Sequence, residues 1–177
     1  DTTTTNTLRL WGAEASENIP ANQDFRHYIQ NVRDICQMLY PDDSTPAGKM
    51  LRLKQEYFFT CAGLSSIVKA HLRNYPNLDN FHEKNVIQLN DTHPVLAIPE
   101  LMRILIDEKG YEWDDAWDIT TQTFAYTNHT ILAEALETWP IDVMQTLLPR
   151  IYQIIEEIHR RFIGYVKMVS NRDEELL

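Results

Sequence analysis

Residues 86–103, VIQLNDTHPVLAIPELMR, change from an apolar strand pattern to a polar turn and then to a helix pattern within a short distance. Val86, Ile87 and Leu89 suit a largely buried strand, and Pro99 fits the first turn of the helix that follows. Open α/β sheets bind their ligands at the carboxyl ends of their strands. This order of elements predicts an α/β fold in which residues 90–93 lie at a ligand-binding edge.

A second polar turn, residues 127–130 (TNHT), follows two predicted helical segments later. His129 lies between apolar residues 124–126 and Ile131, which places it near buried structure. The same residue types often cap helices or satisfy core hydrogen bonds, so the local pattern leaves a capping role and a ligand-binding role both open. If the two turns converge on one cleft, the ligand-binding interpretation is favoured.

The spacing of apolar residues predicts the other elements. We expect a strand over 7–11 and a loop over 40–48. Helices are expected over 25–39 with Asp24 as its cap, over 49–75, from Pro99 to Gly110, from Asp114 or Asp115 through Phe124, and from Pro140 and Pro149 onward. Two strands cannot form a stable sheet by themselves. We therefore expect the remaining strands in other parts of a longer polypeptide.

The composition limits the possible partners. The chain has 16 basic and 26 acidic residues and a net charge of −10, which opposes binding to nucleic acid and to anionic membranes. It has no apolar run near the roughly 20 residues that span a bilayer, and no signal-peptide pattern. Cys36 and Cys61 have no metal-binding spacing, so a cytoplasmic, reducing location is expected.

The chemistry of the two turns suits a sugar. Sugar hydroxyls both donate and accept hydrogen bonds, and Asp91, Thr92, His93 and His129 provide acceptors and donors close together. The sequence contains no phosphate-binding glycine loop, no serine nucleophile elbow and no His-Glu-x-x-His motif. The residues alone therefore predict a polar cleft and no particular mechanism.

Nine short blocks carry a family resemblance: LRLW, YPDDS, GKMLRLKQEYF, VIQLNDTHP, IPELMR, AYTNHT, EALETWP, LLPR and QIIEEIHRRF. In this order and spacing, from about residue 7 to residue 162, they resemble the α-glucan phosphorylases, the glycogen and maltodextrin phosphorylases. The resemblance implies that residues 1–177 are a partial N-terminal domain, a helix-rich α/β fragment of a Rossmann-like GT-B domain with few strands.

The resemblance also implies an activity for the full-length enzyme. This family catalyses reversible phosphorolysis of α-1,4-glucan (glycogen, starch or maltodextrin) to glucose 1-phosphate, with phosphate as co-substrate and pyridoxal phosphate as cofactor. The motif with the cofactor lysine is not in this chain, so no catalytic residue is assigned here and the chain is expected to be inactive alone. The family further implies a homodimer.

Matching motifs assign the site residues. His129 is similar to the histidine that hydrogen-bonds the sixth-position oxygen of the transferred glucosyl unit, and Asp91 and His93 to acceptor-side residues of the cleft. Residues 86–136 correspond to the wall of the active-site cleft. Residues 40–48 correspond to a gate-like loop, and residues 24–39 to a tower-like helix of the dimer. The residues that match neighbouring positions of this wall are Thr130, Glu134, Ala135 and Arg52. The residues that match the gate-like loop are Asp42, Asp43 and Ser44, where the family more often has Asn-Asp-Asn.

Two other classes of function remain open. A metal-dependent hydrolase would use Asp91, His93 and His129 as ligands of one divalent ion, although no tight ligand spacing supports it. A non-catalytic module would bind glucan or dimerise through the apolar stripe of the helix over 25–39.

Overall fold

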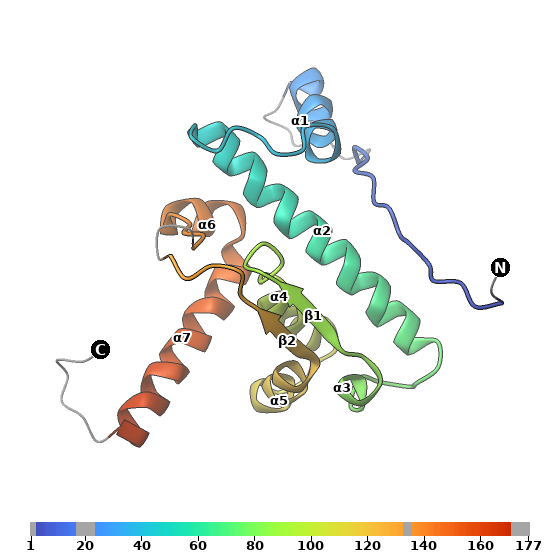
Figure 1. Cartoon of the computed structure of the whole chain (residues 1–177), viewed down its shortest axis with the longest axis vertical. Helices are drawn as coiled ribbons and strands as arrows, with labels where there is room; N and C mark the ends of the chain where they lie inside the picture. The colour runs from blue at the N-terminus through green and yellow to red at the C-terminus, as the bar shows by residue number, and fades with distance from the viewer. Residues whose placement is uncertain (1–2, 17–23, 133–135, 171–177) are drawn as a thin grey trace. The chain divides into compact units, whose positions relative to one another are not determined.

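The computed structural model describes residues 3–16, 24–132 and 136–170. These residues are rich in helix and contain one small parallel sheet (Figure 1), as expected for a helix-rich α/β fragment. The chain divides into two compact units, residues 1–62 and 63–177, which are described separately. Within the described residues, every helix is too short or too polar to cross a membrane.

The first unit contains helix α1 (Phe25–Gln37) and most of helix α2 (Pro46–Leu72). Asp24 caps α1 as predicted, since its Oδ1 accepts a hydrogen bond of 2.8 Å from the backbone N–H of Arg26. At the other end of α1, the buried Gln55 of α2 donates from Nε2 to the carbonyl oxygens of Asp34 and Met38, at 3.3 and 2.9 Å. The carbonyl oxygen of Asp34 also accepts from the backbone N–H of Met38, so Gln55 adds hydrogen bonds to carbonyls at the end of α1.

The strand predicted over residues 7–11 is wrong. The structure assigns no strand there, and Leu8 and Leu10 are about 85% exposed. Alternation of apolar and polar residues forms a strand only where a neighbouring strand can accept its hydrogen bonds, and none of the described strands pairs with this segment.

The second unit contains a β-α-β unit. Strand β1 (Ile87–Asn90), predicted from the sequence, pairs in parallel with β2 (Phe124–Thr127). Helix α4 (Ala97–Arg103), the π-helix η1 (Ile104–Glu108) and helix α5 (Trp113–Thr123) connect the strands, because parallel neighbours need a long crossover. The sequence prediction continued the helix through Phe124, whereas the structure starts a strand there. Aromatic and β-branched residues at 124–127 favour that strand once β1 is available as a partner.

The connection also corrects the predicted helix ends. Gly110 ends the helical segment as predicted, with a φ of +74° that glycine adopts without strain. The predicted cap at Asp114 or Asp115 is wrong, since the N-cap position of α5 is Glu112 and both aspartates lie in the first turn. There they interact favourably with the positive end of the helix dipole.

Short helix α3 (Phe81–Lys84), helix α6 (Ile141–Leu147) and helix α7 (Pro149–Ser170) complete the second unit. Pro149 is the first residue of α7, where its missing N–H is not needed. Side chains from β1, η1, α2, α3, α4, α5 and α7 form one hydrophobic core, whose fully buried members include Phe81, Leu101, Met102, Leu105 and Ala116. This core packs α4, α5 and α7 together next to the two strands.

A buried histidine joins the end of α2 to the start of β1. His71 is 4% exposed, its Nε2 lies 3.1 Å from the carbonyl oxygen of Asn77, and its Nδ1 lies 3.0 Å from Nδ2 of Asn85. The amide of Asn85 also donates to the Phe81 carbonyl oxygen, so Nδ2 is a donor toward His71 as well. Nδ1 of His71 therefore accepts from Asn85, and Nε2 donates to the carbonyl oxygen of Asn77.

We expect His71→Leu to lower the free energy of unfolding by about 2 kcal/mol, because it leaves two buried hydrogen-bonding partners unpaired while keeping most of the apolar bulk. Urea unfolding followed by tryptophan fluorescence measures the change. The exposed Arg73→Ala on the same turn is the control. Equal midpoints for the two variants would contradict the role of His71.

A bidentate ion pair links η1 to the start of α7. Arg150 donates from Nε and Nη2 to the two carboxylate oxygens of Asp107, at 2.8 and 2.6 Å. These hydrogen bonds lower the pKa of Asp107 below its ordinary value of 3.8, although partial burial opposes the shift. The pair is partly solvent-exposed, so its contribution to stability is modest.

Asp107→Asn should lower the free energy of unfolding at neutral pH by at most about 1 kcal/mol, because exposed pairs are screened by solvent. A carboxylate with a lowered pKa in the folded state stabilises above its unfolded pKa and loses that contribution as the pH falls. The difference between variant and parent should therefore shrink below pH 3.8. Urea unfolding across this pH range measures it, with Asp118→Asn as the control; a constant difference would refute the assignment.

Candidate functional site

The structure brings the two polar turns side by side. β1 and β2 are parallel, and their register places Asn90 beside Thr127, the last residues of the two strands. The pairing continues one residue further, because the backbone N–H of Asp91 donates to the carbonyl oxygen of Thr127 at 2.8 Å. Both turns therefore begin at the carboxyl edge of the sheet, where α/β folds hold ligands.

His129 interacts with the opposite turn. Its Nε2 is hydrogen-bonded to Oδ1 of Asn90, which fixes the imidazole over the end of β1. Asn128 and Thr130 shape the second turn through hydrogen bonds between their side chains and the backbone. His129 is otherwise exposed to solvent.

Asp91 has a backbone conformation that non-glycine residues rarely adopt. Its φ is +67°, and its carboxylate Oδ1 accepts a 2.8 Å hydrogen bond from the backbone N–H of Thr92. Aspartate tolerates the left-handed region better than most residues because its short side chain bonds to the local backbone. Strain of this kind often marks residues whose side chains must point in one direction for function.

His93, the third predicted ligand-binding residue, lies in the same turn and is hydrogen-bonded through Nδ1 to Glu137 at 2.9 Å. Glu137 was missed as a site residue. It lies in the EALETWP block, but 44 positions separate it from His93, and no local pattern connects the two. A carboxylate bonded to one imidazole nitrogen orients the ring.

The other predicted residues fall elsewhere. Arg52 and the gate-like loop belong to the first unit, where Arg52 Nη1 donates to Asp43 at 2.6 Å. Ser44 donates from its backbone N–H and its hydroxyl to Asp42 at 3.0 and 2.6 Å, and these hydrogen bonds lower the pKa of Asp42. Glu134 and Ala135 lie outside the described residues.

The loop depends on one glycine. A Cβ added to Gly48 would lie 1.8 Å from the backbone oxygen of Asp42, so only glycine fits where the loop folds back on α2. Its backbone N–H donates to Thr45 Oγ1 at 3.1 Å. Gly48 was expected just before this helix; the structure places it inside the first turns of α2.

Among the described residues of the second unit, the three expected metal ligands do not form one metal site, and no lysine is buried where it could hold the cofactor. Among the described residues, Asp91, His93 and His129 do not group their ligand atoms closely enough to hold one ion. Pyridoxal phosphate is held through a lysine in a pocket, yet Lys69, Lys84, Lys109 and Lys167, the lysines of the second unit, are all exposed. The acids, amides and imidazoles at the edge can instead bind a neutral ligand with many hydroxyl groups.

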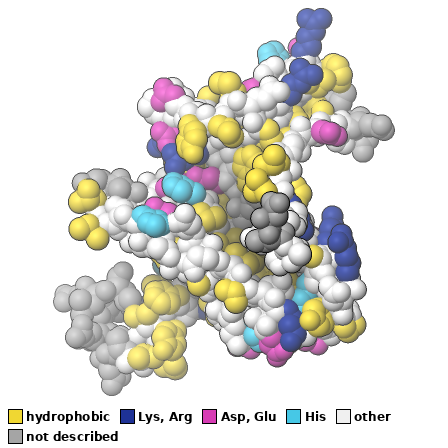
Figure 2. Space-filling view, turned by 45° about the vertical axis from the view of Figure 1, so that its right-hand side comes forward, with side chains coloured by type: hydrophobic (Ala, Val, Ile, Leu, Met, Phe, Trp, Pro, Cys, Tyr) yellow, Lys and Arg dark blue, Asp and Glu magenta, His cyan; other side chains and the backbone are white. Residues whose placement is uncertain are grey.

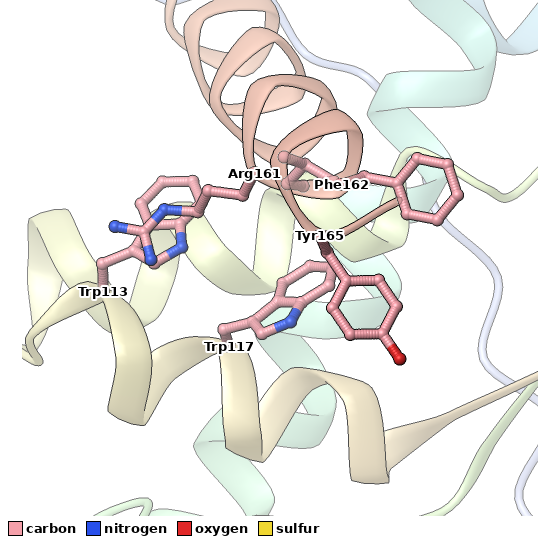
Figure 3. Close-up of a pocket in the computed structure, with 6 residues that line it drawn as sticks. Trp113, Trp117, Arg161, Phe162 and Tyr165 are labelled. Atoms are coloured by element: carbon pink, nitrogen blue, oxygen red, sulfur yellow. The ribbon is translucent and has the colours of Figure 1, made fainter. Parts of the chain in front are cut away.

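Two cavities are described in the second unit. One is lined by residues of α5 and α7 (Figure 3), and the other by the segments after α2 and after η1. Neither is lined by the two turns. The two turns place hydrogen-bond acceptors and donors together at one edge of the sheet. A β-α-β unit with polar turns at this edge is typical of ligand-binding α/β proteins.

Comparison with known proteins specifies the family. The family model described as carbohydrate phosphorylase matches residues 1–177, so the chain belongs to the carbohydrate phosphorylase family. It is 51% identical over 162 residues to a glycogen phosphorylase of Bacillus subtilis, covering 92% of this chain. It is 49% identical to a glycogen phosphorylase of Pasteurella multocida and 50% identical to the human muscle form, each over 97% of this chain.

The chain spans only about a fifth of the length of these relatives, 20% of the Bacillus subtilis protein and 22% of the other two. The resemblance based on nine short sequence blocks is thus confirmed for the family.

The backbone of Asp91 yields a prediction on stability. Asp91→Ala should lower the free energy of unfolding by about 1–2 kcal/mol, because alanine in the left-handed region has no side-chain hydrogen bond to offset the strain. Asp91→Gly should be nearly neutral, and Asp91→Asn intermediate. Urea unfolding of the three variants tests this order. Equal stability of the alanine and glycine variants would show that this backbone conformation is not maintained in solution.

Proposed function

We propose that this chain is part of the N-terminal, Rossmann-like domain of a GT-B α-glucan phosphorylase and positions the glucosyl unit during phosphorolysis. In the full-length enzyme the reaction is the reversible transfer of a terminal glucosyl unit of α-1,4-glucan to phosphate, giving glucose 1-phosphate. Membership of the carbohydrate phosphorylase family supports this reaction. The observation that carries the assignment is the meeting of the two polar turns at one edge.

Each residue has a proposed part in holding the sugar. His129, fixed by Asn90, hydrogen-bonds the sixth-position hydroxyl of the transferred glucosyl unit. Asp91 and His93 line the acceptor side. Thr130, Glu134, Ala135 and Arg52 complete the wall, and Asp42, Asp43 and Ser44 belong to the gate. Such contacts contribute by orienting the reacting groups, which lowers the barrier without any proton transfer by this chain.

The cofactor and partners follow from the same proposal. Pyridoxal phosphate, bound through a lysine outside this chain, supplies a phosphate group for acid-base catalysis. Alone, the chain is therefore inactive. We place the enzyme in the cytoplasm, in keeping with Cys36 and Cys61 not being joined in a disulfide.

A second candidate function concerns α1. None of its residues is buried, and Phe25, at its start, is 55% exposed. Exposed apolar residues on a helix face favour an interaction surface. We propose that this tower-like helix contributes to a homodimer, and that a chain lacking the catalytic partner domain can act only as a dimerisation or glucan-binding module.

The assignment of His129 is tested in the intact enzyme. His129→Ala should lower kcat/KM for maltoheptaose phosphorolysis by about tenfold or more, because a hydrogen bond to the reacting sugar is lost. In the direction of glucan synthesis, the parent enzyme should prefer glucose 1-phosphate to its 6-deoxy analogue, and the variant should lose most of that preference. This double comparison isolates the interaction between His129 and the 6-hydroxyl.

His159→Ala, an exposed histidine on α7, is the control and should keep the parent's preference. An unchanged kcat/KM for His129→Ala would refute its role in binding. A large loss of activity with the 6-hydroxyl preference intact would show that His129 acts elsewhere than at that hydroxyl.

A further inference from the structure

The exposed face of β1 carries polar side chains that bond across to β2 and to the turn after it. Side chains alternate along a strand, so Leu89 is buried in the core while Gln88 and Asn90 lie on the exposed face. Gln88 Nε2 donates to Thr127 Oγ1 at 2.7 Å, and Asn90 Oδ1 is hydrogen-bonded to Nε2 of His129. Both pairs join residues that are 39 positions apart. The contact with His129 therefore repeats the cross-strand pattern one step beyond the end of β2.

This contact determines the hydrogen-bonding role of each nitrogen of His129. The amide oxygen of Asn90 can only accept, so Nε2 of His129 donates to it. In a neutral imidazole the other nitrogen then carries no hydrogen and can only accept. Within the described residues, no second hydrogen bond to the His129 ring accompanies the one from Asn90. Nδ1 is therefore left as an acceptor without a partner in this part of the chain.

The turn that carries His129 is closed without the imidazole. Asn128 donates from Nδ2 to the carbonyl oxygen of Thr130 at 2.6 Å and accepts from its backbone N–H at 3.2 Å. The backbone N–H of Leu132 donates to Thr130 Oγ1 at 3.2 Å. Asn90 and His129 are both exposed, and a hydrogen bond in contact with water adds little to stability. The contact between them thus orients the imidazole more than it stabilises the fold.

We propose that Asn90 is a specificity-determining positioning residue, which keeps Nδ1 of His129 as an acceptor so that the site selects a sugar hydroxyl that donates to it. The proposal rests on the proposed function, in which His129 contacts the sixth-position hydroxyl of the transferred glucosyl unit. It adds the direction of that hydrogen bond: the hydroxyl donates and the imidazole accepts. Such a site rejects an analogue without a donor, even when the analogue carries an acceptor at the same place.

Analogues of glucose 1-phosphate test the direction in the intact enzyme, assayed for glucan synthesis at a mildly alkaline pH, where imidazole groups are generally neutral. The 6-deoxy analogue has neither donor nor acceptor at the sixth position, and the 6-deoxy-6-fluoro analogue has a weak acceptor only. The parent should prefer glucose 1-phosphate to each analogue by about tenfold in kcat/KM, and the two analogues should differ by less than about twofold. A fluoro analogue that reacts nearly as well as glucose 1-phosphate overturns the proposal, since the imidazole would then be the donor.

Substitutions at Asn90 test its part in this selection. Asn90→Leu removes the acceptor for Nε2 and should reduce the preference for glucose 1-phosphate over the fluoro analogue to about threefold or less, because the ring can then turn or move its hydrogen. Asn90→Asp keeps an acceptor oxygen and should keep most of the preference. Gln88→Leu is the matched control, since it removes a cross-strand hydrogen bond on the same face without touching His129, and it should behave as the parent. Each preference is a ratio measured on one preparation, so a smaller folded fraction does not change it.

The remaining outcomes separate this proposal from the proposed function. If His129→Ala loses the preference while Asn90→Leu keeps it, His129 contacts the hydroxyl without help from Asn90, and only the role of Asn90 is overturned. Loss of the preference in Asn90→Asp, or an equal loss in Asn90→Leu and Gln88→Leu, also overturns that role. A preference that survives in His129→Ala, or a parent enzyme that does not use glucose 1-phosphate, refutes the proposed function and this proposal with it.

Discussion

The parallel pairing of β1 with β2 determines what the second unit presents to a ligand. The register sets Asn90 beside Thr127, and the hydrogen bond from Asp91 to Thr127 extends the pairing into the turns. A shift of one residue would turn the side chains of β2 to the opposite face of the sheet. Asn90 would then no longer be placed to hold His129. The site thus depends on backbone hydrogen bonds more than on any single side chain.

The sequence was sufficient to predict helix ends that are determined by neighbouring residues. Asp24 caps α1 and Gly110 ends the segment after η1, because each acts on its own backbone. The strand β2 was not predicted, and its first residue, Phe124, was assigned to the preceding helix, because the strand conformation depends on pairing with β1 far away in sequence. The contact of His93 with Glu137 was missed for the same reason. The sequence shows which chemical groups the two turns contain. It does not show which distant residues these groups contact.

The candidate site combines rigidity with exposure. Asp91 is half-buried and held in a left-handed conformation, and His129 is held by Asn90 although it is exposed. A fixed edge with donors and acceptors suits a ligand made of neutral hydroxyl groups, since each contact is weak and specificity comes from their arrangement. Orientation of this kind becomes catalytic only when another wall closes and water is excluded.

The packing of the described residues is also incomplete. In the part of the chain that the structure describes, the sheet has two strands, and hydrophobic side chains stay exposed on the C-terminal part of α7, at the lower left of Figure 2. Two strands contribute little stability by themselves, so the core formed by α4, α5 and α7 has to hold the edge in place. The stiffness of that core is transmitted to β1 and β2, because packed interiors resist deformation.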